Sequence, residues 1–151
     1  MWAVAMAALA CAGSPRAHHS IGMFDISKPI WIKGTVVSYE QVNPHALIAL
    51  EEKGRDGQVR HWTVEGPILA RLNRMHVDKS FLKAGDAIEV CGFAFKEPAA
   101  NQHAFVHGHM LLMPDGHMQP WGPYGKLDNC VRPSDRRQSW VDFLNSDSIA
   151  R

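Results

Sequence analysis

Apolar and polar residues alternate with a period of two along most of the chain between residues 30 and 113. A period of two is typical of β-strands that bury one face. It predicts five strands, over residues 30–39, 46–52, 59–65, 87–95 and 104–113. Between the third and the fourth strand the period changes, because Ile68, Leu69, Leu72 and Met75 follow helical spacing. Residues 67–75 are therefore predicted to form a helix.

Three strands, a helix and two strands follow one another in the order of the five-stranded OB barrel. We therefore expect a mostly β fold, an OB-like barrel with one helix between strands three and four. An open α+β sandwich with the same element order is the alternative. Asp56-Gly57 is expected to form the hairpin turn after the second strand. Residues 18–120 would form the barrel and an N-terminal arm, and residues 121–151 an extension with a short helix after Ser134.

The chain begins with an apolar run, Trp2 to Ala12, followed by Gly13-Ser14-Pro15. This run is too short for a membrane-spanning helix, which needs about 20 residues. It predicts a secretory signal peptide over residues 1–17, a periplasmic location and no transmembrane helix in the mature protein. A lipoprotein anchored through Cys11 fits less well, because Ala8 stands where a larger aliphatic residue is usual. A buried N-terminal helix is a further alternative.

Removal of the leader would leave two cysteines, Cys91 and Cys130. In an oxidising compartment two cysteines can pair. The disulfide would join the C-terminal segment to a central strand. Two unrelated thiols are the alternative.

Charge and motifs exclude several function classes. The chain has 16 Lys and Arg against 15 Asp and Glu, without a basic cluster, so nucleic acid is not expected as a partner. It contains no Gly-rich phosphate loop, nucleophile elbow or Cys-x-x-Cys motif. Carboxylates such as Glu40, Glu65 and Asp86 have no partnered arrangement in the sequence. We therefore expect a function without catalysis.

Histidine is abundant, with nine residues, and neutral imidazole is the commonest metal ligand in proteins. Histidines at alternate positions of a strand project to one face, roughly 6.5–7 Å apart. The last predicted strand should turn Ala104, Val106, Gly108, Met110 and Leu112 toward the core, and His103, Phe105, His107, His109 and Leu111 away from it. That second face is either a metal-binding face or a solvated one.

Three further observations extend the metal hypothesis. His45 ends the loop between strands one and two, and His103 ends the loop between strands four and five, so the OB topology places both at one rim. His18-His19 would lie on the arm, which is long enough to reach the barrel. Thioethers favour Cu(I), and Met110, Met113 and Met118 are softer candidates. We expect a periplasmic metal-binding protein for copper capture or handover, with zinc as the second choice.

A protein-docking module is the alternative function. OB barrels serve widely as platforms for ligands and partners. Trp121, Tyr124, Trp140 and Phe143 would then form a docking surface for a periplasmic protein, and the histidines would be incidental.

Several short motifs together resemble a bacterial exported family of unknown function, in which His-His-Ser follows the signal peptide. The resemblance covers roughly residues 17–117 and lies in His18-His19-Ser20, Phe24-Asp25, Lys28-Pro29, Lys33-Gly34-Thr35-Val36, Asn43-Pro44-His45, Leu82-Lys83-Ala84-Gly85-Asp86 and Pro114-Asp115-Gly116. It implies a periplasmic location and a small β-barrel, and no particular activity. The extra histidines of the last strand and the C-terminal extension depart from the family pattern.

Overall fold

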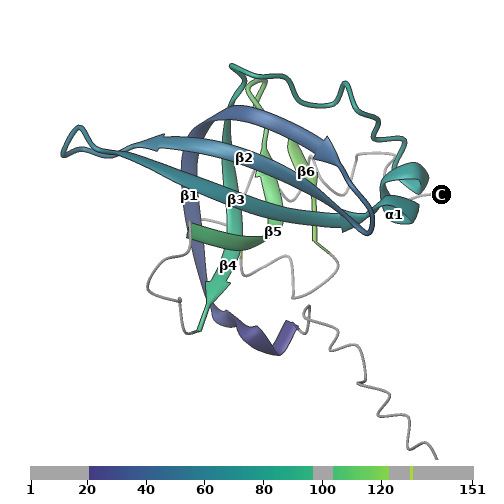
Figure 1. Cartoon of the computed structure of the whole chain (residues 1–151), viewed down its shortest axis with the longest axis horizontal. Helices are drawn as coiled ribbons and strands as arrows, with labels where there is room; N and C mark the ends of the chain where they lie inside the picture. The colour runs from purple at the N-terminus through teal and green to yellow at the C-terminus, as the bar shows by residue number, and fades with distance from the viewer. Residues whose placement is uncertain (1–20, 97–103, 123–129, 131–151) are drawn as a thin grey trace, which may run out of the picture.

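The computed structural model describes residues 21–96, 104–122 and 130. These residues form six strands, one α-helix and one 3-10 turn (Figure 1). In chain order the elements are η1 (Ile21–Met23), β1 (Phe24–Gln41), β2 (His45–Lys53), β3 (Val59–Ile68), α1 (Leu69–Arg74), β4 (Ala87–Phe95), β5 (Ala104–Leu112) and β6 (Met118–Pro120). The five predicted strands and the helix between the third and the fourth are confirmed. The short strand β6 was not predicted.

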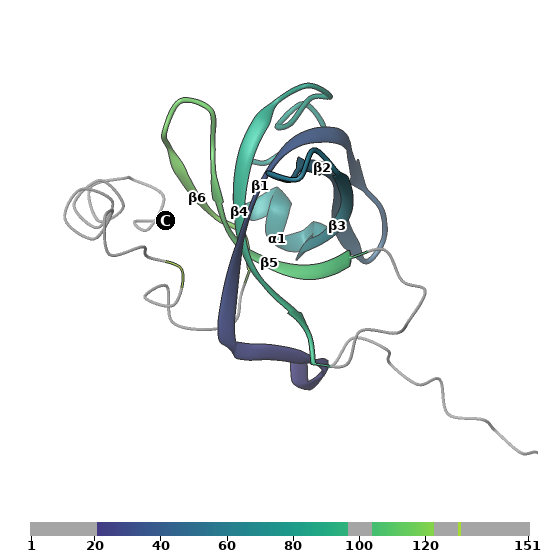
Figure 2. The same cartoon turned by 90° about the vertical axis from the view of Figure 1, so that its left-hand side faces the viewer.

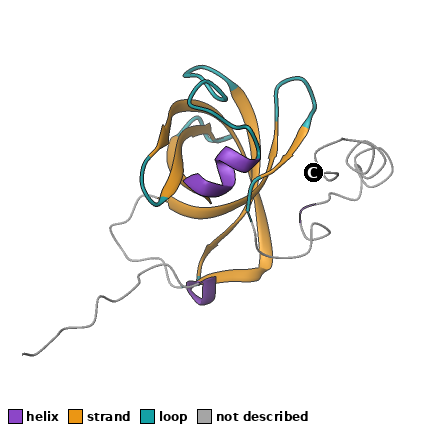
Figure 3. Cartoon of the chain, turned by 90° about the vertical axis from the view of Figure 1, so that its right-hand side faces the viewer, coloured by secondary structure: helices purple, strands orange, loops and turns teal. Residues whose placement is uncertain are grey.

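The strands hydrogen-bond in the order β3-β2-β1-β4-β5-β6, and all of these neighbours are antiparallel. A further, parallel pairing joins β3 to β5, with Trp62 opposite Ala104 and Glu65 opposite His107. Strands β1 to β5 therefore form a continuous hydrogen-bonded ring, seen along its axis in Figure 2. Helix α1 lies across one end of this ring (Figure 3). The fold is mostly β and OB-like, as the element order predicts.

The core fills the inside of the ring. The predicted alternation is confirmed on β2, where Ala46, Ile48 and Leu50 are each at most 1 % exposed. On β1, Ile32 and Val36 are buried in the same cluster, and α1 adds Leu72. Strand β1 is longer than expected, because the segment before Pro29, interpreted as an extended arm, already pairs with β4 at Phe24.

A β-bulge interrupts β5 at His109. Cys91 of β4 pairs with Met110 and the next residue, Gly92, pairs with Gly108, so His109 is an extra residue on β5. Because side chains alternate along a strand, one extra residue exchanges the two faces beyond it. Leu111 therefore lies in the main core, and Met110 lies on the outer face. The prediction that Met110 and Leu112 continue the core face is wrong for this reason.

Trp121, just after β6, is fully buried inside the core. Its indole stacks on Phe81, with centroids 5.6 Å apart. Two glycines make room for the indole, because a Cβ on Gly66 would lie 2.5 Å from Trp121 Nε1 and one on Gly108 would lie 2.8 Å from Trp121 Cδ1. The expectation that Trp121 belongs to an exposed docking surface is therefore wrong.

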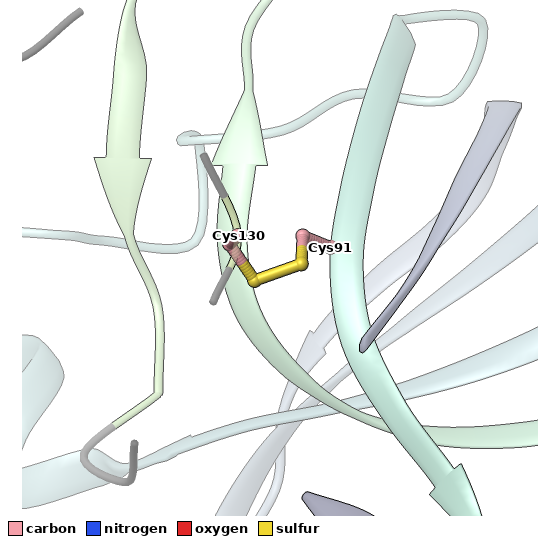
Figure 4. Close-up of a disulfide and its surroundings, with 2 residues drawn as sticks. All are labelled: Cys91 and Cys130. Carbon is pink, nitrogen blue, oxygen red and sulfur yellow. A yellow bond between two sulfur atoms is a disulfide. The ribbon is translucent and has the colours of Figure 1, made fainter. Parts of the chain in front are cut away.

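Cys91 and Cys130 form a disulfide, as predicted (Figure 4). Both residues are fully buried. The bond joins β4 to a residue 39 positions later in the chain, so it fastens the segment beyond β6 to the ring.

Other sequence predictions fall outside the described residues. They concern the signal peptide of residues 1–17, Cys11, the helix after Ser134, and the residues His18, His19, His103, Tyr124, Trp140 and Phe143. In the part of the chain that the structure describes, no helix is both long and apolar enough to cross a membrane.

Candidate functional site

A buried carboxylate lies between two histidines on the outer face of the ring. Glu65 is 3 % exposed, and its two oxygens face different imidazoles. Oε1 lies 3.5 Å from Nδ1 of His45, and Oε2 lies 3.6 Å from Nδ1 of His107. His107 is buried as deeply as Glu65, whereas the side chain of His45 is 23 % exposed. We call these three residues the Glu65 cluster.

Strand register brings the cluster together. Val64 and Val106 point into the core, so their chain neighbours Glu65 and His107 point outward. These two residues are directly opposite each other in the parallel pairing of β3 with β5. His45 is the first residue of β2 and pairs with Ile68, three residues beyond Glu65. The loop before His45 is held by α1, whose Leu69 N–H donates to the Pro44 carbonyl oxygen.

A hydrogen bond indicates the tautomer of His45. Its Nδ1 lies 3.0 Å from the carbonyl oxygen of Gly66, which can only accept. Nδ1 must therefore carry the proton in that bond, so in the neutral ring Nε2 holds the lone pair. A carboxylate near Nδ1 favours the same tautomer, because it accepts or attracts the same proton.

An aromatic wall covers His107. The ring of Phe24 lies 5.4 Å from the imidazole of His107 and 4.7 Å from the ring of Phe95, on which it stacks. Phe105 joins the same stack, 5.3 Å from Phe95. These rings keep water from one side of the Glu65 cluster. Charges interact more strongly where water is excluded, so a cation bound at the cluster would interact strongly with the Glu65 carboxylate.

His109 is buried beside the cluster without joining it. It is 1 % exposed, and its ring lies 5.5 Å from that of Phe93. Among the described residues, neither ring nitrogen of His109 has a hydrogen-bond partner. Burial lowers the pKa of His109, and His107 and Arg71 lower this pKa further. The neutral form of His109 is therefore favoured.

This lowered pKa predicts a pH dependence of folding. In the unfolded chain His109 takes up a proton near pH 6.5, while the folded protein resists it. The stability that neutral His109 contributes is therefore fully present above that pH. Below it, this stability falls as the pH decreases, by at most about 1.4 kcal/mol per pH unit. We expect the His109→Leu variant to lose less stability than the wild type between pH 7 and pH 5, in urea unfolding with a chelator present. Equal losses would contradict this assignment.

The structure separates the predicted ligands into groups. It brings His45 and His107 to one carboxylate, places His109 on the same outer face, and does not describe His18, His19 or His103. The alternative of a solvated histidine face is wrong for His107 and His109, which are both buried. Met110 and Met118 pack near the disulfide, and Met113 packs on the main core. Within residues 21–96, 104–122 and 130, no three or more His, Cys, Asp or Glu side chains are placed to hold one metal ion.

Sequence reasoning missed Glu65. It was grouped with carboxylates that lack a partner, and the structure corrects this. One signal was present, since Glu65 directly follows the inward-facing Val64 and precedes Gly66-Pro67. Its partners, however, are distant in the sequence. His45 lies 20 residues before Glu65, and His107 lies 42 residues after it. Only the pairing of β3 with β5 reveals them.

Comparisons with known proteins identify a family and find a solved structure with limited similarity. The sequence model of a family of unknown function, DUF6152, matches residues 5–105. No curated protein matches the chain. Among solved structures, the small single-stranded DNA-binding protein from Streptomyces coelicolor is similar, with 16 % identity and a TM-score of 0.39. That similarity covers 56 % of this chain and 92 % of the other.

Proposed function

The chain belongs to the DUF6152 family of unknown function, and we propose that it is a metal-binding protein that uses the Glu65 cluster. The supporting observation is a buried carboxylate that faces Nδ1 of both His45 and His107. Histidines that bind metals commonly direct their second ring nitrogen at a carboxylate or a carbonyl, which fixes the tautomer and the ring orientation. Glu65 would serve this purpose for both rings, and Nε2 would be the ligand atom of each.

Further ligands are within reach of the cluster along the chain. His103 precedes His107 by four residues, so their Cα atoms lie within about 14 Å of each other. His19 precedes Phe24, whose ring packs on His107, by five residues, which limits that Cα separation to about 18 Å. We propose that His103 and either His18 or His19 complete the coordination begun by His45 and His107.

Copper is the proposed metal and zinc the second choice. Imidazole suits both ions, and Cu(II) binds a given nitrogen site more tightly than Zn(II) does. The carboxyl group of Glu65, when ionised, would also favour a cation over a neutral ligand. The proposed role is capture or handover of the ion.

A periplasmic location is part of the proposal. The apolar leader and a buried disulfide are both typical of exported proteins. The five-stranded ring would then be a small OB-like barrel that presents the cluster outside the cell membrane.

The test is calorimetric titration of Cu(II) and Zn(II) into metal-free full-length protein. We expect saturable binding of one ion per chain, with loss on His45→Ala or His107→Ala. Glu65→Gln removes the charge and keeps the shape, so affinity should fall by roughly 10- to 100-fold. The matched control is His61→Ala, because His61 faces Glu51 at 3.6 Å in an exposed pair that resembles the buried one.

Weak heat without saturation for both ions would reject the metal function. Equal affinity in the wild type and Glu65→Gln would reject the Glu65 cluster as the site. The protein-docking alternative, with Tyr124, Trp140 and Phe143 as its remaining residues, would then be tested by pull-down with and without residues 123–151.

A further inference from the structure

Sulfur-bearing side chains gather at one place on the outer face of the ring. Cys91 of β4, Met110 of β5 and Cys130 pack together, and Met118 of β6 and Trp31 of β1 pack against them. We call this group the sulfur cluster. It is separate from the main core, which is made almost entirely of aliphatic and aromatic side chains. The two cysteines form a disulfide, whose sulfur atoms are poor metal ligands, so the sulfur donors of this cluster for a soft metal are the two thioethers.

The β5 bulge turns an imidazole to the same face of the sheet as these thioethers. Consecutive residues of a regular strand point to opposite faces, but the bulge gives His109 and Met110 the same one. His109 packs on Phe93 and Met110 packs on Cys91, and these two β4 residues share the outer face. A regular strand would have separated the imidazole from the thioether by the thickness of the sheet.

The burial of His109 without a hydrogen-bond partner among the described residues indicates that its imidazole binds a ligand. A buried polar group without a hydrogen bond is expensive, and native proteins rarely keep one without a reason. In the described part of the chain, both ring nitrogens of His109 are buried and neither has a hydrogen-bond partner. Leucine would fill the same space without this penalty. An imidazole whose nitrogens no described protein group engages can, in contrast, serve as a metal ligand.

We propose that His109, Met110 and Met118 form a second metal site, selective for Cu(I). Thioether and imidazole ligands carry no charge, so they suit a soft monovalent ion and give little to hard divalent ones. Trp31 borders the same group and adds an aromatic face, which attracts cations. Met118 is only partly buried, so the ion would enter from its side. The site shares no residue with the Glu65 cluster and does not depend on the function proposed for it.

The experiment titrates Cu(I) without oxygen against the chromogenic chelator bicinchoninate, with the disulfide verified by mass spectrometry. We expect one Cu(I) per chain at this site. Met110→Leu and Met118→Leu keep the volume and remove the sulfur, so each should lower Cu(I) affinity by about tenfold or more. The matched control is Met113→Leu, a methionine of the main core, which should not change Cu(I) affinity.

X-ray absorption at the copper edge gives a second measurement that needs no variant. Sulfur neighbours of copper in the wild-type protein would support the site, and neighbours that are only nitrogen or oxygen would overturn it. The site is also overturned if Cu(I) affinity is the same in Met110→Leu, Met118→Leu and the wild type. If Cu(I) affinity falls instead in Glu65→Gln, the ion belongs to the Glu65 cluster, and the first proposal survives alone.

Discussion

Replacing Trp121 with alanine should lower the free energy of unfolding by about 3–5 kcal/mol, as for other large buried aromatic residues. The indole is fully buried, stacks on Phe81 and lies 6.1 Å from the ring of Tyr39. Gly66 and Gly108 line the space that it leaves with backbone alone, so on their side no side chain can fill it. Urea unfolding followed by circular dichroism measures the difference.

A double-mutant cycle tests the physical cause of this loss. Gly66→Ala alone should cost about 1–3 kcal/mol, because its Cβ would overlap the indole. In the Trp121→Ala background the same Cβ meets empty space, so most of that cost should disappear. If the two losses simply add, Gly66 and Trp121 do not constrain each other, and the explanation given for the glycine is wrong.

Removing the disulfide is the second large effect. Cys91→Ala with Cys130→Ala opens a loop of about 40 residues, worth about 4 kcal/mol in the chain-entropy model. Both cysteines are also buried beside Met110, so some packing is lost as well. The free energy of unfolding of the double variant, measured against a Cys11→Ala control, gives the size of the effect. A loss below about 1 kcal/mol would mean that the bond closes no entropically important loop.

Alternation predicted the five strands of the ring because each buries one face on the core. Ala46, Ile48 and Leu50 illustrate this, since their inward positions follow from the period alone. The helix was found for a similar reason, although α1 is shorter than the predicted range. The sequence pattern alone therefore predicts a strand or helix wherever that element buries one face on the core.

Three features could not be found in this way. The bulge at His109 leaves no clear local trace, because the four residues after it, Met110 to Met113, are all apolar and fit either face of the strand. The partners of Glu65 depend on the register of β3 against β5, two strands that are distant in the chain. Trp121 fills a space created by two glycines that precede it by 55 and 13 positions, Gly66 and Gly108. Each feature is a relation between distant segments.

The position of Trp121 has a practical consequence for work on shorter pieces of the protein. The recognisable family sequence ends at residue 105, near the start of β5. A truncation made there would remove most of β5, all of β6, the indole that fills the core and one half of the disulfide. The smallest fragment expected to fold therefore extends to Cys130, about 25 residues past the point where sequence similarity would suggest stopping.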